Sequence, residues 1–254
     1  MGSIAQRHNY ILEQLKKEGF VKVQDLSKAL DVSEVTIRKD LRTLEAKKLL
    51  TRNHGSASSL SSLITDRHID VKEKINIEEK EAIAKAANDL LQPNDKIIIA
   101  SGTTLLTFAN NINIHFPLTV ITSSVKVSLS LCYNSHIEIV QLGGSIRKNS
   151  VSVVGHFAES ILNSVSCNIL FLGVDGIDLN YGLTTSNMSE AYINQQMINV
   201  ADKVVVLTDS SKFGKRGFSK ICDFDKIHHV ITDSKAPAHM VEMIKDLGIE
   251  VTLV

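Results

Sequence analysis

The chain has 254 residues, of which 43% are hydrophobic, enough for one large or two ordinary folded domains. Its 28 basic and 28 acidic residues cancel overall, yet residues 1–58 hold 11 Lys and Arg against 7 Asp and Glu, and the remainder holds 17 against 21. No stretch of roughly 18 apolar residues occurs and the first residues lack the apolar centre of a secretion signal, so we expect a cytoplasmic protein with no membrane partner. A basic head on an acidic body favours contact of the head with a polyanion such as DNA.

The first 57 residues carry the periodicity of three helices followed by a short extended segment. The first helix has residues at helical spacing and ends before a glycine: Ile4, His8, Ile11, Leu12 and Leu15, with Gly19 as the C-cap. Residues 25–41 predict two further helices separated by a short turn. The first has an apolar stripe of Leu26, Ala29 and Leu30, and the second has one of Ile37, Leu41 and Leu44. Both stripes are expected to face one small core. Such a helix pair near a chain end is the arrangement that places one helix in a DNA groove.

The second helix of this pair has a capped start and a cationic outer face. Ser33 stands at the N-cap position and Glu34 in the first turn, where a side-chain oxygen and a negative charge stabilise a helix. Residues 49–56 predict a two-stranded wing, so we expect residues 1–57 to form a winged helix-turn-helix domain that binds double-stranded operator DNA. The expected DNA contacts are Ser33, Thr36, Arg38, Lys39, Arg42, Arg52 and His54. The alternatives are a helical dimerisation or linker module with solvated charges, or a module for protein contacts.

The rest of the chain predicts a linker and an α/β domain. Residues 56–64 are serine-rich and uncharged, and we place the linker at residues 58–74. Residues 75–254 alternate apolar strand-like runs with amphipathic helices, which predicts a mostly parallel, Rossmann-like α/β domain. The expected strands are residues 97–100, 118–122, 137–142, 169–174, 204–208, 230–232 and 251–254. The expected helices lie near residues 77–91, 104–112, 125–132, 157–163, 190–200 and 238–247.

Small, hydroxylated, glycine-bearing or charged residues follow five of these strands. Ligands bind at the carboxyl ends of the strands in such sheets, and the turn Ser-Gly-Thr-Thr at residues 101–104 can surround a phosphate at a helix N-terminus. An ordinary loop is the alternative for any one turn, but together they predict a site for a small phosphorylated sugar or polyol. The expected effector-binding residues are Ser101, Gly102, Thr103, Thr104, Ser123, Gly143, Gly144, Arg147, Asp175, Gly176, Asn187 and Lys212.

We expect neither a cofactor nor a metal. The 13 glycines never occur as Gly-x-Gly, so the motifs for NAD and ATP are absent, and the histidines lack the spacing of metal ligands. Cys132, Cys167 and Cys222 are far apart and lie beside apolar residues, so we expect reduced packing residues.

With these motifs in place, the chain resembles the DeoR family of bacterial transcriptional regulators over nearly its whole length. Residues 33–41 are similar to the family's recognition-helix signature, and its effector-domain signatures are matched in order by residues 101–104, 142–148, 173–178, 182–187 and 209–214. The resemblance implies a repressor of a carbohydrate-utilisation operon whose operator affinity is controlled by a phosphorylated effector. It adds Glu190 to the expected effector-binding residues. Because one small head offers too little interface for specific affinity, we expect a dimer or tetramer.

The family's effector domain is similar to ribose-5-phosphate isomerase, so a sugar-phosphate isomerase is the alternative function. In those enzymes an Asp-Gly-Ala-Asp strand end precedes a glycine-rich loop with a lysine and then a catalytic glutamate. Residues 175–178 and Glu190 look like the first and last elements, but residues 182–187 have no lysine and one glycine. Because an enediolate needs an electrophile as well as a base, we expect binding without catalysis.

Three positions depart from the family pattern. Ala100 stands where Asp is frequent before the phosphate turn, Ser123 where Asn is common, and Ser56 where the wing often has a second glycine. We therefore expect an intact phosphate site with an altered shell around the sugar.

Overall fold

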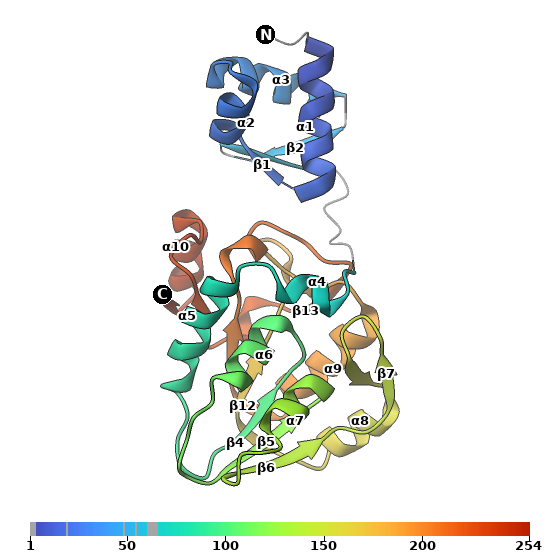
Figure 1. The fold of residues 1–254 in the computed structure, drawn as a ribbon, viewed down its shortest axis with the longest axis vertical. Coiled ribbons are helices and arrows are strands. Elements are labelled where there is room, and N and C mark those ends of the chain that lie inside the picture. Colours follow the sequence, from blue (N-terminus) through green and yellow to red (C-terminus); the bar gives the residue numbers. More distant parts are fainter. Residues whose placement is uncertain (1–3, 19, 48, 54, 60–65) are drawn as a thin grey trace. The chain divides into compact units, whose positions relative to one another are not determined.

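The computed structural model describes residues 4–18, 20–47, 49–53, 55–59 and 66–254. The chain divides into two compact units, residues 1–64 and 65–254 (Figure 1). Each unit has its own hydrophobic core. None of the described helices is long and apolar enough to cross a membrane.

Three helices are described in the first unit: α1 (Ile4–Glu18), α2 (Val23–Leu30) and α3 (Glu34–Ala46). Residues 31–33 form the turn between α2 and α3, and Asp31 adopts the left-handed conformation there (φ 49°). The predicted cap of α3 is confirmed, because the Ser33 hydroxyl accepts a hydrogen bond from the Thr36 N–H at 3.2 Å. The helix that carries the cationic face therefore starts at a locally encoded point.

One small core holds these helices together. Its members are Ile11, Leu15, Val21, Val23, Leu26, Ile37, Leu41, Leu44, Leu50 and Ala57. The prediction that Ala29 faces this core is wrong, since Ala29 is exposed. The reason is that α2 begins at Val23, which, with Leu26, supplies the buried side of the helix.

A three-stranded antiparallel sheet completes the first unit. Its strands are β1 (Phe20–Lys22), β2 (Leu50–Asn53) and β3 (Ser56–Ser59), in the order β1-β3-β2. The hairpin of β2 and β3 is the expected wing, but the prediction of two strands missed β1. Three residues are too few to show alternation, although Val21 is buried and lies opposite Ala57.

The second unit is built on a seven-stranded sheet in which every neighbouring pair is parallel. Its strands are β4 (Lys96–Ile99), β5 (Leu118–Thr122), β6 (Ile137–Gln141), β9 (Cys167–Leu172), β12 (Ala201–Leu207), β14 (His229–Thr232) and β15 (Glu250–Leu253). They correspond to the seven predicted runs, which confirms the α/β fold class. The order β15-β14-β12-β9-β4-β5-β6 places β4 beside β9, so the direction of winding reverses between these two strands.

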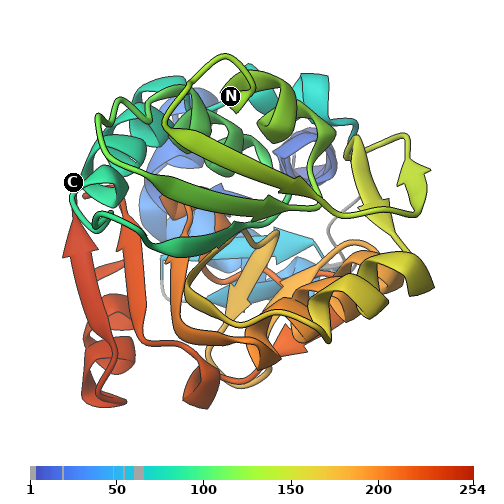
Figure 2. The same ribbon diagram turned by 90° about the horizontal axis from the view of Figure 1, so that it is seen from below.

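Helices cover both faces of the sheet (Figure 2). The helices α5 (Ile77–Asn88), α6 (Thr103–Asn110) and α7 (Val125–Leu131) lie on one face, and α8 (His156–Leu162) and α9 (Met188–Asn199) lie on the other. The last helix, α10 (Ala238–Asp246), packs beside β15, and short 3-10 turns occupy Ser210–Lys212 and Phe224–Lys226. All six predicted helices are confirmed, because each buries an apolar stripe against strands that are themselves apolar on both faces.

Two small antiparallel sheets were not predicted. One is the hairpin of β7 (Ser145–Arg147) and β8 (Ser152–Val154), and the other joins β10 (Gly176–Asp178), β11 (Gly182–Thr185) and β13 (Ser219–Cys222). Gly182 is required in β11, since its φ is +98° and a Cβ there would lie 2.3 Å from the carbonyl oxygen of Cys222. These sheets extend the carboxyl edge of the main sheet.

Residues 66–74, which we expected in the linker, belong to the second unit. They include the short helix α4 (Ile69–Glu73), whose first residue is buried. Lys126 bonds two acidic side chains of α4 at 2.8 and 2.6 Å, and the buried ammonium of Lys80 donates to two carbonyls at its end at 2.6 and 2.5 Å. Burial lowers the pKa of Lys80 to about 8. These tertiary contacts, and no local pattern, order the segment.

The three cysteines are free thiols. Cys167 and Cys222 are buried as expected, and burial raises their pKa values to about 11 and about 12. The prediction for Cys132 is wrong: it caps the solvent-exposed end of α7 and is itself exposed.

Candidate functional site

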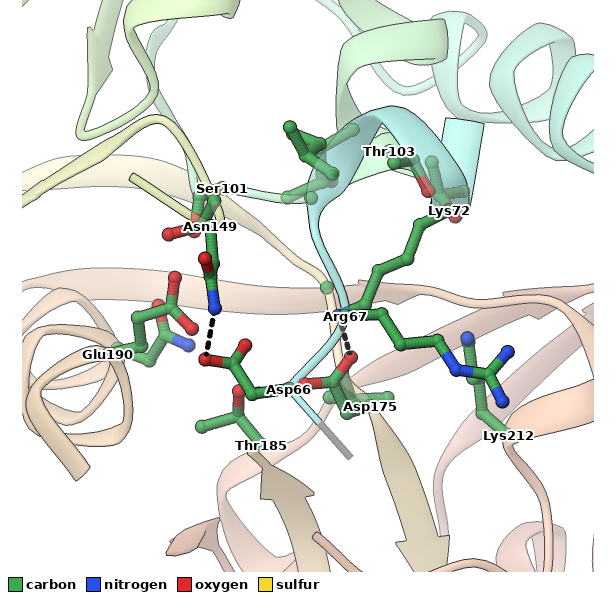
Figure 3. Close-up of a pocket in the computed structure, with 18 of the residues that line it drawn as sticks. Asp66, Arg67, Lys72, Ser101, Thr103, Asn149, Asp175, Thr185, Glu190 and Lys212 are labelled. Atoms are coloured by element: carbon green, nitrogen blue, oxygen red, sulfur yellow. Dashed lines mark hydrogen bonds and ion pairs between the residues drawn. The ribbon is translucent and has the colours of Figure 1, made fainter. Parts of the chain in front are cut away.

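A cavity of about 60 Å³ lies where the winding of the second unit reverses, between the ends of β4 and β9 (Figure 3). Side chains from the β7–β8 hairpin, from β11 and α9, and from residues 66–72 complete its wall. Eight of the predicted effector-binding residues line it: Ser101, Gly102, Thr103, Thr104, Arg147, Asp175, Glu190 and Lys212. The cavity thus occupies the position at which open parallel sheets bind ligands.

The turn at residues 101–104 leads from β4 into α6. Gly102 has a φ of +144°, which favours glycine, and it directly precedes the helix. The N–H groups in the first turn of a helix have no intrahelical partner, and here no described side chain caps them. Together with the helix dipole, these N–H groups and the hydroxyls of Thr103 and Thr104 suit an anion.

The cavity carries an excess of positive charge. Its charged lining residues are the cations Arg67, Lys72, Arg147 and Lys212 and the carboxylates Asp66, Asp175 and Glu190. Arg67 and Lys212 form no ion pair with any residue in the described ranges, and both are drawn on the same side of the cavity in Figure 3. Their charges are therefore available to a bound anion.

Asp175 follows β9 and is the most constrained carboxylate of the site. It accepts hydrogen bonds from Lys72 Nζ at 2.7 Å and from Thr185 Oγ1 at 3.1 Å, and from the N–H and hydroxyl of Ser186 at 3.0 and 2.9 Å. Burial alone would raise the pKa of Asp175, but the charge and hydrogen bond of Lys72, with Lys212 and Ser186, outweigh it and lower the pKa to about 2. Asp175 is therefore ionised at neutral pH and holds Lys72 at the cavity.

Arg147, on β7, joins two further carboxylates. It donates a hydrogen bond to Asp66, and its Nη1 lies 3.3 Å from Oε1 of Glu190. The Asp66 carboxylate also accepts from Asn149 Nδ2 at 2.9 Å and Ser186 Oγ at 3.3 Å. The Arg147 and Glu190 side chains are only 14% and 10% exposed, so their contact is largely shielded from water, whereas the Asp66 side chain is 31% exposed.

Five predicted residues do not line the cavity: Ser123, Gly143, Gly144, Gly176 and Asn187. The first three follow β5 and β6, which lie one and two strands from the reversal point. Gly176 pairs within β10, and the Asn187 side chain caps α9 by accepting from the N–H groups of its first turn. The five strand ends therefore do not all meet at one site. The sheet is wider than the cavity.

Seven polar or charged lining residues were not predicted: Asp66, Arg67, Lys72, Asn149, Ser150, Thr185 and Asn194. Asn194 lies one turn after Glu190 on α9, so helical spacing was a usable signal. The three residues of the 66–72 stretch had none, since they follow a serine-rich segment and precede a five-residue helix.

The arrangement around Glu190 differs from what the isomerase reading requires. Residues 182–185 form β11, which is buried and paired on both edges by β10 and β13. This segment is thus a sheet strand, whereas the isomerases have a glycine-rich loop with a lysine at this point. Among the described residues, no group of three His, Cys, Asp or Glu side chains is placed to hold a metal ion.

In the first unit, the outer face of α3 carries most of the predicted DNA contacts. Arg38, Lys39 and Arg42 are exposed, as is Ser33 at the helix start, and Thr36 is half-buried. Arg38 is tied to Glu34 one turn earlier at 2.5 Å, with both side chains open to solvent. An exposed pair of this kind is weak and can be exchanged for a phosphate.

The two predicted contacts from the wing differ from the helix residues. Arg52 on β2 donates its Nε–H to Glu45 of α3 at 2.6 Å, and its backbone N–H bonds the same carboxylate at 3.1 Å. These hydrogen bonds lower the pKa of Glu45. Arg52 therefore braces the wing against α3, and His54 lies outside the described residues.

A buried carboxylate on α3 links that helix to α1. Asp40, 5% exposed, accepts from Arg7 Nε at 2.8 Å and Arg7 Nη2 at 3.1 Å, and lies 3.1 Å from His8 Nε2. This contact fixes the orientation of the cationic helix on its core.

Comparison with known proteins bears on both units. A family model described as the DeoR-like helix-turn-helix domain matches residues 7–63, and one described as the DeoR C terminal sensor domain matches residues 75–234. The chain is 37% identical over 252 residues to a putative aga operon transcriptional repressor of Escherichia coli O157:H7, covering 98% of this chain and 94% of the relative. It is 34% identical to a lactose phosphotransferase system repressor of Staphylococcus epidermidis, covering 90% of this chain and 91% of the relative.

Among solved structures, ribose 5-phosphate isomerase A from Methanocaldococcus jannaschii aligns with 54% of this chain and 55% of its own. The identity is 19% and the TM-score is 0.41. A score this low has no bearing on activity.

Proposed function

Because the chain belongs to the DeoR family of transcriptional regulators, we propose that it represses a carbohydrate-utilisation operon under the control of a small phosphorylated sugar or polyol. In this proposal α3 and the wing of the first unit contact operator DNA. The effector binds in the cavity of the second unit and changes operator affinity. The name of the lactose phosphotransferase system repressor above supports the carbohydrate class.

The observation that carries the effector class is the joint presence of four cations and an uncapped helix start at the strand reversal. A phosphate monoester carries about −1.5 to −2 charges at neutral pH. The turn at residues 101–104 offers N–H groups, and Arg67 and Lys212 offer charge without a competing ion pair. The carboxylates of Asp175 and Glu190 then suit the hydroxyls of a sugar or polyol.

The test begins with a thermal-shift screen of the purified chain against phosphorylated sugars and polyols. A ligand that binds the folded state raises the melting temperature with its concentration over its Kd. Operator DNA is obtained by selection from random duplexes, and each hit is tested for its effect on operator affinity at fixed salt and for chemical turnover. A hit that alters DNA affinity and is recovered unchanged supports the proposal; conversion of the hit without any effect on DNA contradicts it and favours the isomerase.

Assembly and location stay predictions. A single small head offers little interface for a specific site, so we expect a dimer or tetramer, which sedimentation measures directly. A cytoplasmic location is expected of an operator-binding protein.

A further inference from the structure

The cavity as it stands is too small for the proposed effector. Sites for small molecules enclose roughly 300 to 1,000 Å³, whereas this one holds about 60 Å³. Side chains of residues 66–72 fill part of the missing space: Asp66 on one side of the cavity and Lys72 on the other (Figure 3). The site is therefore narrowed by side chains of its own chain.

The Asp66 carboxylate sits where a ligand oxyanion would be bound. Donors from Arg147 and Asn149 converge on it. These two residues lie 81 and 83 positions away in the chain. A carboxylate that collects charged and neutral donors in this way resembles a bound ligand more than a surface residue.

We propose that Asp66 is an intramolecular substitute for the effector, and that an oxyanion of the effector, phosphate or carboxylate, displaces it from Arg147. This inference rests on the proposed function and names how its site is regulated. With Asp66 in place the charged lining residues sum to +1, and without it they sum to +2, which matches a phosphate dianion. Ligand binding and the Asp66 contact thus exclude each other.

Displacement is confined to the residues before α4. Ile69 is buried, its N–H bonds a carbonyl of the β7–β8 loop at 2.7 Å, and Lys126 clamps the acidic side chains of the helix. The helix therefore stays on the second unit while residues 66–68 move. These three residues also lie between the two ranges that match the family models.

The test is calorimetric titration of the full chain with inorganic phosphate. We expect Asp66→Ala to bind phosphate about tenfold more tightly than the unsubstituted chain, or to bind one additional phosphate, because a charge-assisted contact no longer competes. Asp66→Asn keeps the shape of the side chain but loses its charge, so its phosphate affinity should lie between those of the unsubstituted chain and Asp66→Ala. The control is Glu78→Ala, which removes an exposed carboxylate of α5 outside the cavity and should change neither affinity nor stoichiometry.

Arg147 supplies the second control. The gain in phosphate affinity of Asp66→Ala should disappear in the double variant Asp66→Ala with Arg147→Gln. In that variant no guanidinium is left to bind the oxyanion in place of Asp66. Phosphate binding that is equal or weaker in both Asp66 variants would overturn the substitution by Asp66 and leave the proposed function intact. If no variant binds phosphate or any phosphorylated sugar, the proposed function itself fails.

Discussion

Replacing Asp175 with Asn should destabilise the second unit by an amount that depends on pH. The carboxylate has an ordinary pKa of 3.8 and a pKa of about 2 in the folded chain, chiefly because Lys72 outweighs the effect of burial. Each pKa unit corresponds to 1.36 kcal/mol, so the ionised carboxylate contributes about 2 kcal/mol to the free energy of unfolding at pH 7. Asn is nearly isosteric but uncharged, and it forfeits this contribution.

The sign of the pH dependence follows from the lowered pKa. The contribution is fully present above the unfolded value near pH 4 and is lost as the pH falls towards 2, because the unfolded chain binds the proton first. Asn does not titrate, so the difference between the two proteins should stay constant from pH 7 to about pH 5 and fall to about half by pH 3. Lowering the pH therefore brings the unsubstituted chain towards the variant.

The assay is urea-induced unfolding, monitored by hydrogen–deuterium exchange of the backbone amides of β9. These amides report on the second unit alone. Two-unit chains need a local probe, since their global transitions can overlap. Asp178→Asn is the matched control: Asp178 pairs with Arg216, which is 39% exposed, and such pairs contribute about 0 to 1 kcal/mol. A difference for Asp175→Asn below about 0.5 kcal/mol at pH 7, or one that grows on acidification, would refute this account of the site.

Three further outcomes follow from the same structure. Arg42→Ala on the exposed face of α3 should weaken operator binding by about 1 to 3 kcal/mol and lower its salt dependence, whereas Lys245→Ala on α10 should do neither in the same titration. Asp40→Asn should lower the stability of the first unit, seen as lost amide protection in α1, because it removes the carboxylate of α3 that accepts two hydrogen bonds from Arg7 of α1; full protection would contradict the packing described. Gly182→Ala should lower the melting temperature far more than Gly214→Ala, since only the first places a Cβ 2.3 Å from a backbone oxygen; equal shifts would mean that β11 is not held as observed.

Short stretches of the sequence determine most of the secondary structure of this protein. The seven parallel strands and six of the second unit's helices follow from runs of four to twelve residues, and the cap at Ser33 from a single side chain. The turn at residues 101–104 was found in the same way, since a strand end, a positive-φ glycine and a helix start are adjacent in the chain. Local periodicity and capping act over a few residues, which is why sequence reading reaches them.

Tertiary structure alone decided which of the candidate residues share the cavity. Arg147 reaches it through a hairpin of three-residue strands, whereas Ser123 and Gly143, equally plausible in sequence, lie at strands too far from the reversal. Asp66 and Lys72 show no pattern of their own and gain their places only from partners 81 and 103 residues away. Pairings at that separation depend on the order of strands in the sheet, which no local run of side chains encodes.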